Sequence, residues 1–447
     1  MFKRILIANR GEIATRILRC CRELDIETVV VYSDADAQSL PVMLATKAVC
    51  IGPAKASESY LNQDVILEMA VRTGCDAIHP GYGFLSENAS FAGLCEKNNI
   101  TFIGPSSDII AKMGDKQSAR VLMMQHGVPV VPGSKDLVSS LDEARMIAGD
   151  IGYPVLLKAS AGGGGKGIRK VYSEEELEDA YHTAKAEAKA AFGNDDMYLE
   201  KLIINPHHIE IQILADKQGN TVYLGERDCS IQRNNQKLLE ESPSAVISDE
   251  QRAAMGKVAV TAAKACGYYS AGTVEFVVDS EGHYYFIEMN TRIQVEHPVT
   301  EEITGVDLLR EQIRIAAGMK LSVSQQDIVV RAHAIECRIN AQTPGVIRTL
   351  HFPMGFGVRI ESHLFTGYEV SPFYDSMIAK IIVSGKTRLE AIRRMRRALE
   401  ELIIEGVETN VEFMHVLTYH PQFIKGRYDT SFWEKYHSEL EEWMKES

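Results

Sequence analysis

A glycine-rich run is the most conspicuous stretch of the sequence that could do chemistry. Ala161-Gly162-Gly163-Gly164-Gly165-Lys166-Gly167 offers successive backbone N–H groups and lets the backbone approach a phosphate closely. It is not a P-loop, because Ser160 stands where the first glycine is required and Gly167 follows the lysine in place of Ser or Thr. It is not a dinucleotide fingerprint either, because it lies between two expected strands and opens no helix. We therefore expect a hairpin that closes over a nucleoside triphosphate, the alternative being a merely flexible surface hairpin.

Two glutamates on an expected hairpin could bind a metal. Strand signals at 274–278 and 284–290 flank a turn at 279–282, which places Glu275 nearly opposite Glu288. Like charges that face each other across a sheet are destabilising unless something neutralises them. Two carboxylates and an amide oxygen suit Mg²⁺, with phosphate oxygens filling its remaining positions. The apolar neighbours favour this half-buried metal site over the alternative in which both acids point to solvent.

Polar residues keep alternating after Glu288, at Asn290, Arg292, Gln294 and Glu296. If the segment stays extended, all of these side chains point the same way. Convergent polar groups must be paired when they are buried. The floor of an active site explains the pattern better than a solvated edge strand, which is the remaining alternative.

Two further segments are rich in polar side chains. Residues 208–213 alternate polar and apolar, so His208, Glu210 and Gln212 share one face of what is otherwise an ordinary half-buried strand. Residues 226–233 crowd charge into what we expect to be a short loop that ends before Lys237, a pattern more typical of a solvated surface. Their occurrence with the glycine run and the glutamate pair favours a shared site.

The elements that must position these residues change along the chain. Strand and helix signals alternate over the first hundred residues, with strands at 4–8, 28–32, 77–79 and 100–105 and helices at 12–24 and 64–73. Such βαβ alternation predicts a parallel sheet covered by helices. A helix at 107–126, a proline-marked linker at 128–133, strands at 154–158 and 168–172, antiparallel strands after 203 and a basic helix at 389–402 follow. The expected fold class is α/β, mixing α/β and α+β parts.

Composition excludes several classes of protein. A chain of 447 residues with 45% hydrophobic content can bury more than one core, so a single small binding module is a poor interpretation. The net charge of −13 is spread over interspersed acids and bases, which argues against nucleic acid as a partner. The sequence contains neither a long apolar run nor a signal-peptide pattern, so we expect no membrane association and a cytoplasmic protein. The eight scattered cysteines indicate neither a zinc site nor a disulfide framework.

Several segments together resemble the biotin carboxylase family of ATP-grasp enzymes. The matching signatures are Asn9-Arg10-Gly11-Glu12-Ile13-Ala14, residues 79–88 (HPGYGFLSEN), Lys158-Ala159-Ser160 with the glycine run, and residues 288–297 (EMNTRIQVEH). The resemblance covers essentially the whole chain. It implies a Rossmann-like N-terminal domain at 1–115, a linker helix and mobile ATP-grasp lid at 116–202, and a C-terminal half at 203–447 that completes the ATP site.

The resemblance also implies roles for individual residues. ATP contacts would come from Lys116, Lys158, Gly163, Gly164, Gly165, Glu200, Lys201, His208, Gln232, Glu275 and Glu288. The ligands of Mg²⁺ or Mn²⁺ would be Glu275, Glu288 and Asn290. Bicarbonate would lie among Lys237, Arg292, Gln294 and Val295, with Glu296 as the base that deprotonates it. Arg338 would stabilise the biotin enolate, and Tyr82 would lie near biotin.

The sequence departs from the family pattern at two places. Asn235 stands where the family usually has a histidine, and the segment after Arg338-Ile339-Asn340-Ala341 is shorter than usual. Another ATP-grasp ligase, such as a purine-pathway carboxylase or a carbamoyl phosphate synthetase-like enzyme, is a competing interpretation. A nucleotide-binding regulatory subunit without catalysis is a further one, supported by the shortened segment. The joint presence of Lys237, Arg292, Glu296 and Arg338 favours the biotin carboxylase.

The expected partners follow from the same resemblance. Biotin would be carried by a separate biotin carboxyl carrier protein, because the usual Met-Lys-Met attachment context does not occur near Ser447. A carboxyltransferase subunit would then select the acceptor. We expect acetyl-CoA, as in the first half-reaction of acetyl-CoA carboxylase that leads to malonyl-CoA and fatty acids. The alternative is a split pyruvate carboxylase or another acyl-CoA carboxylase. The family also implies a homodimer.

Overall fold

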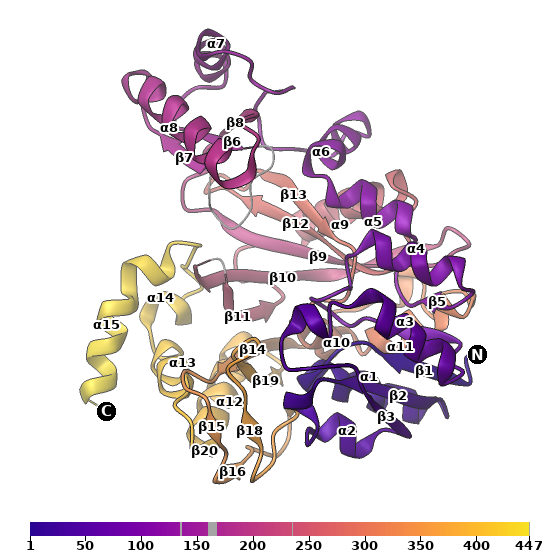
Figure 1. Cartoon of the computed structure of the whole chain (residues 1–447). Coiled ribbons are helices and arrows are strands. Elements are labelled where there is room, and N and C mark those ends of the chain that lie inside the picture. Colours follow the sequence, from indigo (N-terminus) through magenta and orange to yellow (C-terminus); the bar gives the residue numbers. More distant parts are fainter. Residues whose placement is uncertain (135, 160–167, 235, 447) are drawn as a thin grey trace. The chain divides into compact units, whose positions relative to one another are not determined.

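The computed structural model describes residues 1–134, 136–159, 168–234 and 236–446 (Figure 1). The chain divides into two compact units. Unit 1 comprises residues 1–114, 207–275 and 289–447, and unit 2 comprises residues 115–206 and 276–288. Unit 1 is thus built from three separate stretches of sequence. Both strands of the hairpin that carries Glu275 and Glu288 cross the boundary between the units.

A parallel sheet with the strand order β3-β2-β1-β4-β5 forms the N-terminal part of unit 1. Its strands are β1 (Arg4–Ile7), β2 (Glu27–Tyr32), β3 (Lys47–Cys50), β4 (Ala77–His79) and β5 (Thr101–Phe102). The accompanying helices are α1 (Gly11–Glu23), α2 (Leu40–Leu44), α3 (Gln63–Arg72), α4 (Ala89–Lys97) and α5 (Ser107–Gly114). The chain reverses its winding direction between β1 and β4. Ligands of such sheets bind beyond the carboxyl ends of the strands at this switch point.

Unit 2 contains a small antiparallel sheet in the order β7-β6-β8. Its strands are β6 (Val155–Ala159), β7 (Ile168–Val171) and β8 (Met197–Lys201), and its helices are α6 (Lys116–Gln125), α7 (Leu141–Ile151) and α8 (Glu174–Phe192). The sheet and helices share a core that includes Val155, Leu157, Ala184 and Leu199. The glycine run, with Gly163, Gly164 and Gly165, lies outside the described residues.

A large sheet in the order β13-β12-β9-β10-β11-β14-β19-β17 follows in the described part of the chain. Its strands are β9 (His207–Ala215), β10 (Thr221–Arg233), β11 (Gln236–Ser242), β12 (Ser270–Val278), β13 (Tyr284–Asn290), β14 (His333–Asn340), β17 (Val358–Ser362) and β19 (Met377–Gly385). The pairings from β9 through β17 are antiparallel. Two short ribbons pair β15 (Gly345–Val346) with β18 (Glu369–Val370) and β16 (Thr349–His351) with β20 (Ile403–Glu405).

Helices cover both faces of this sheet at β14 and β19. The remaining helices are α9 (Asp249–Ala265), α10 (His297–Thr304), α11 (Leu308–Ala316), α12 (Arg388–Glu401), α13 (Val411–Leu417), α14 (Pro421–Ile424) and α15 (Phe432–Glu446), with short 3₁₀ turns at Asp34–Asp36, Ala56–Glu58 and Gln325–Asp327. Apolar residues of β14 such as Ile335 and Ile339 pack in one core with Ile392 and Met395 of α12. Ala334 and Ile382 pack with Val299 and Ile303 of α10. Because side chains alternate along a strand, Glu336 and Arg338 of β14 point away from α12.

Three expectations about local structure are wrong. The helix expected at 107–126 is two helices, because the Asp115 side chain caps α6 by accepting from the Ser118 N–H at 2.7 Å. The segment after Glu288 does not stay extended, since β13 ends at Asn290 and α10 begins at His297. The charged segment 226–233 is not a solvated loop, because it belongs to β10 and residues 226–228 are at most 1% exposed.

Candidate active site

A cavity of about 540 Å³ opens in unit 1 where several polar segments meet. Its walls come from the loops that follow β1 and β4, from the ends of β11 and β14, and from the loop before β19. It is lined by Asn9, Arg10, Gly11, Glu12, Ile13, Ala56, Tyr82, Gly83, Phe84, Gln236, Lys237, Arg292, Val295, Arg338, Asn340 and residues 373–377. The switch point of the parallel sheet thus faces the polar face of the antiparallel sheet.

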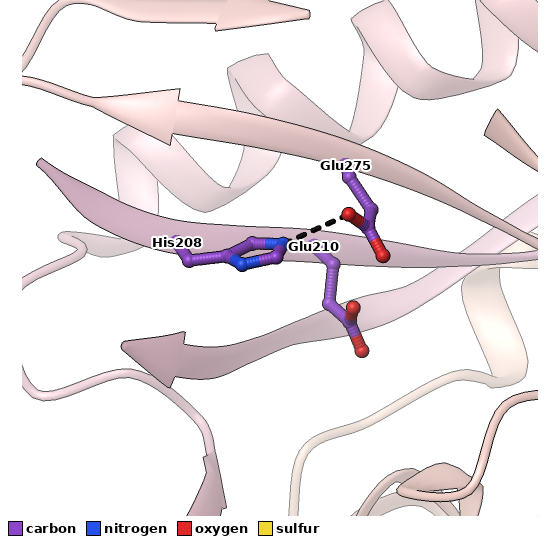
Figure 2. A group of neighbouring side chains, drawn as sticks. All are labelled: His208, Glu210 and Glu275. Carbon is purple, nitrogen blue, oxygen red and sulfur yellow. Dashed lines mark hydrogen bonds and ion pairs between the residues drawn. The ribbon is translucent and has the colours of Figure 1, made fainter. Parts of the chain in front are cut away.

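Lys237 of β11 is surrounded by carboxylates. Its Nζ lies 2.6 Å from Glu210, 2.6 Å from Glu296 and 3.3 Å from Glu275. The His208 ring of β9 lies 2.9 Å from the Glu275 carboxylate of β12. Figure 2 shows this contact, with Glu210 beside it. The ligand atoms of His208, Glu210 and Glu275 lie within 4.8 Å of one another, close enough to share a cation.

Burial and neighbouring charges together determine the protonation states of Lys237, Glu296 and Glu275. Burial lowers the pKa of Lys237, but the surrounding acids outweigh it and hold that pKa well above its ordinary value. Burial raises the pKa of Glu296, but Lys237 and Arg338 outweigh it and hold that pKa well below its ordinary value. Glu275 behaves likewise, its pKa being lowered by Lys237 and His208 against burial. The ammonium and these carboxylates are therefore charged at neutral pH.

Arg227 lies at the centre of the sheet and was missed by sequence reasoning. Its guanidinium, fully buried, pairs with Glu210 at 2.5 Å and donates to Gln212 at 2.6 Å and to Gln294 at 2.8 Å. It also donates to Thr273 and Thr300 at 3.1 and 2.9 Å. The period-two pattern of residues 226–233, with Cys229 and Ile231 between polar residues, is the signal that could have revealed a buried strand.

Arg338 of β14 contacts two acids. Its Nε donates to Glu240 at 2.6 Å, and its terminal nitrogen lies 3.0 Å from the second carboxylate oxygen of Glu296. Both oxygens of Glu296 are thus matched by cations, Lys237 on one and Arg338 on the other.

The backbone around Arg338 is held by Asn410. The Asn410 side chain accepts from the Asn340 N–H at 2.7 Å and donates to the Arg338 carbonyl at 3.0 Å. The next backbone bonds join Ala341 N–H to Ser376 and Gln342 N–H to Glu408 at 2.8 and 2.7 Å. The shortened segment begins after this clamp, so its length does not determine where Arg338 lies.

The segment after β13 converges on Glu275 although it is not extended. Asn290 and Gln294 donate side-chain N–H groups to Glu275 at 2.7 and 2.9 Å. Arg292 donates to Glu87 at 2.8 Å and to the Asn290 side-chain oxygen at 3.1 Å. Val295 lines the cavity. Sequence reasoning was right about the convergence, but a turn achieves it, not strand alternation.

Tyr82 forms part of the opposite wall. Its hydroxyl donates to Glu12, and Asn9 fixes its loop by donating to the carbonyls of Pro80 and Tyr82 at 2.7 and 2.8 Å. Burial and the neighbouring Glu12 raise the pKa of Tyr82 well above its ordinary value. The hydroxyl therefore stays protonated and remains a hydrogen-bond donor.

The remaining expected nucleotide residues are divided between the units. In unit 2, Lys116 pairs with Glu288 at 3.2 Å and Lys158 pairs with Glu200 at 2.5 Å. Lys201 donates to the carbonyls of Gly152 and Tyr153 at 3.0 and 2.8 Å. In unit 1, Gln232 donates weakly to the Cys229 carbonyl at 3.4 Å. Lys116 is largely exposed, which leaves its ammonium accessible to a ligand.

Comparisons with known proteins match most of the chain. Residues 1–110 match the family model for the biotin carboxylase N-terminal domain, residues 115–324 the carbamoyl-phosphate synthase L chain ATP binding domain, and residues 336–435 the biotin carboxylase C-terminal domain. Biotin carboxylase 1 of Bacillus subtilis is 57% identical over 445 residues, covering 98% of this chain and 99% of the relative.

Relatives from other carboxylases are nearly as similar. A pyruvate carboxylase subunit of Methanothermobacter thermautotrophicus is 52% identical over 444 residues, covering 98% of this chain and 90% of the relative. A crystal structure of the biotin carboxylase domain dimer of Hydrogenobacter thermophilus 2-oxoglutarate carboxylase, in complex with MgADP, ADP and bicarbonate, superposes with a TM-score of 0.92. That protein is 51% identical, with 98% of this chain and 99% of the other covered.

Proposed function

The chain belongs to the biotin carboxylase family of ATP-grasp ligases, and we propose that it carboxylates biotin on a separate carrier protein, using ATP and bicarbonate. The proposal is carried by one arrangement in unit 1, in which Glu296 pairs with both Lys237 and Arg338, and these two cations line a cavity that Tyr82 also lines. This arrangement brings together a carboxylate that can act as a base, two cations that can hold an anion, and a cavity that can hold the ureido ring of biotin. We also propose domain limits of 1–115, 116–202 and 203–447.

Bicarbonate fits the cationic end of this cavity. We assign it to Lys237, Arg292, Gln294 and Val295, with Glu296 as the base. The carboxylate of Glu296 is a weak base while Lys237 and Arg338 both pair with it. An anion that draws these cations toward itself weakens their hold and raises the pKa of Glu296. Glu296 thus becomes a stronger base when bicarbonate is present. It takes the proton of bicarbonate, and the carbonate dianion that results is held for attack on the γ-phosphate of ATP.

The residues that we assign to ATP and to Mg²⁺ or Mn²⁺ include donors from each of the two units. We assign ATP to Lys116, Lys158, Glu200, Lys201, His208 and Gln232 with the glycines 163–165, and the metal to Glu275, Glu288 and Asn290. The donor set fits, because carboxylates and an amide oxygen are the hard oxygen ligands that these ions prefer. Asn290 and Glu275 already lie within hydrogen-bond distance of each other. A bound metal would neutralise the charge of the triphosphate.

Biotin fits the other end of the cavity, with Arg338 and Tyr82 as its contacts. A ureido ring is small, neutral and polar on one edge, and the cavity offers the Arg338 guanidinium beside apolar surface from Phe84 and Met377. Attack on the γ-phosphate would release ADP and give carboxyphosphate, which breaks down to CO₂ and phosphate. That phosphate takes the proton of the ureido N–H, so that negative charge develops on the ureido oxygen and the nitrogen can attack CO₂. A guanidinium stabilises that charge without giving up its own proton.

The partners are proposals as well. The carrier protein and a carboxyltransferase would complete the reaction, and we propose acetyl-CoA as the acceptor, with pyruvate or 2-oxoglutarate as the alternatives that similar relatives represent. A homodimer is supported by Met354 and Phe356, which are 73% and 88% exposed and lie beside Arg394 and Arg397. Exposed apolar side chains next to arginines are typical of interfaces.

Location is proposed to be cytoplasmic. The eight cysteines all fall in the described residues and are free thiols, as is usual in a reducing compartment. Among residues 1–134, 136–159, 168–234 and 236–446, no helix is both long and apolar enough to span a bilayer.

The test of the reaction is ADP release from the purified protein with MgATP. We expect release to require bicarbonate, to be stimulated by free biotin, and to be abolished in Glu296→Ala. ATP binding without turnover would contradict the carboxylase and favour a regulatory role. Labelled bicarbonate supplied with carrier and carboxyltransferase then distinguishes acceptors, because acetyl-CoA gives malonyl-CoA and pyruvate gives oxaloacetate.

A further inference from the structure

Lys380 of β19 is a buried cation to which neither the sequence nor the proposed reaction gives a role. Its side chain is fully buried, and it lies directly opposite Arg338 in the register of β14 and β19. Burying an ammonium without good partners is costly, and an apolar residue would fill the same space at lower cost. Two contacts of the Lys380 ammonium, one with a backbone carbonyl and one with a carboxylate, therefore indicate its structural role.

One contact holds the backbone next to the proposed base. Lys380 Nζ donates to the Val295 carbonyl at 2.7 Å. This carbonyl belongs to the peptide unit that joins Val295 to Glu296, and a peptide unit is planar. A hydrogen bond to this oxygen therefore fixes the orientation of the peptide plane that leads into Glu296. The same bond holds Val295, which forms one wall of the proposed bicarbonate site.

The other contact leads to the opposite wall. Lys380 Nζ lies 3.1 Å from the Glu12 carboxylate oxygen that also accepts from the Tyr82 hydroxyl. The second oxygen of Glu12 is buried without a hydrogen-bond partner among the described residues. Glu12 therefore depends on Lys380 and Tyr82, and loss of the ammonium would leave a buried carboxylate uncompensated.

We infer that Lys380 is a positioning residue that fixes the bicarbonate wall and the biotin wall of the cavity at once, through the Val295 carbonyl and the Glu12–Tyr82 pair. The inference rests on the proposed function and deepens it. Lys380 contacts neither ligand, and it acts by holding Glu296 and Tyr82 at a constant separation while the two substrates react in sequence.

The test compares three variants by steady-state ADP release. Lys380→Met combined with Glu12→Gln removes the ion pair without changing the net charge, so folding is preserved better than in Lys380→Met alone. Tyr82→Phe removes the hydroxyl at the biotin wall. Arg252→Met is the matched control, because it breaks the buried Glu226 ion pair elsewhere in unit 1. Thermal melting checks that each variant is folded.

We expect the double variant to raise KM for bicarbonate, measured without biotin, and KM for free biotin, each by about tenfold, the effect of losing a charge-assisted hydrogen bond. KM for MgATP should change less than about twofold, whereas general loosening of the fold would raise all three. Tyr82→Phe should raise KM for biotin alone, and Arg252→Met should leave all three unchanged.

The outcomes separate the inference from the function on which it rests. If the wild-type protein releases no ADP in response to bicarbonate, the proposed function fails. If the wild type turns over and the folded double variant keeps both KM values, or loses affinity for one substrate alone, Lys380 does not couple the walls and the inference is overturned.

Discussion

Substitution of Arg227 should reduce the unfolding free energy of unit 1 more than substitution at most other positions. Arg227→Met removes a fully buried guanidinium from Glu210 and leaves four further acceptors, on Gln212, Gln294 and two threonines, without their donor. Removing one partner of a buried ion pair typically costs about 3–5 kcal/mol. Glu210 keeps Lys237 at 2.6 Å, which offsets part of the loss. We therefore expect a decrease in unfolding free energy of about 3 kcal/mol.

Tryptophan fluorescence during urea unfolding can measure this loss selectively. Both tryptophans of the chain, Trp433 and Trp443, belong to unit 1, so their signal follows the unit that contains Arg227. The matched control is Arg72→Met, which breaks an exposed pair with Glu68 one turn away on α3 and should cost less than about 0.5 kcal/mol. A loss below about 1 kcal/mol for Arg227→Met, or equal losses for the two variants, would refute the argument that burial makes this network valuable.

Three further predictions concern the reaction, pH and assembly. Glu296→Gln keeps the shape of the base but cannot accept a proton, so kcat for bicarbonate-dependent ADP release should fall by about 100-fold or more, while unchanged kcat would exclude Glu296 as the base. Burial raises the pKa of Glu241, but His333 and Arg388 outweigh burial and lower that pKa from 4.5 to about 2. The ionised carboxylate therefore stabilises the fold by about 3 kcal/mol above pH 4.5, and this stabilisation is lost as the pH falls toward 2. Urea titrations of Glu241→Gln and the wild type should therefore differ at pH 7 and converge on acidification, and a constant difference would contradict this. Phe356→Glu should shift the protein toward monomer in sedimentation velocity, whereas Met146→Glu, at an exposed apolar position of unit 2, should not.

The sequence predicted the α/β fold class, the parallel sheet and the hairpin, because these depend on local periodicity. Strands such as β1 and β6 and helices such as α1 and α12 fall within a few residues of their expected limits. The order of strands in the large sheet could not be predicted, since pairing β11 with β14 joins residues about a hundred positions apart and depends on tertiary packing.

The candidate site was predicted in part. Asn290, Gln294 and Glu296 converge as expected from a pattern too polar for ordinary packing, and Lys237, expected there from the family resemblance, joins them. Arg227 was missed because charged residues are rarely buried, and its neutralising acid, Glu210 of β9, and its threonine acceptors on β12 and α10 come from other elements. Lone residues such as Lys380 carry no local signal at all, since their significance lies in contacts made across the fold.

The Asn410 clamp has a consequence for the evolution of the chain. Because the amide of Asn410 secures the end of β14 from both sides, the stretch that follows is free to lengthen or shrink without moving Arg338. Residues 343–344, between the Gln342 bond to Glu408 and β15, are then a place where insertions are tolerated, as in other connections whose ends are independently anchored. Chains of this kind can therefore diversify close to Asn340, which lines the cavity, without displacing Arg338.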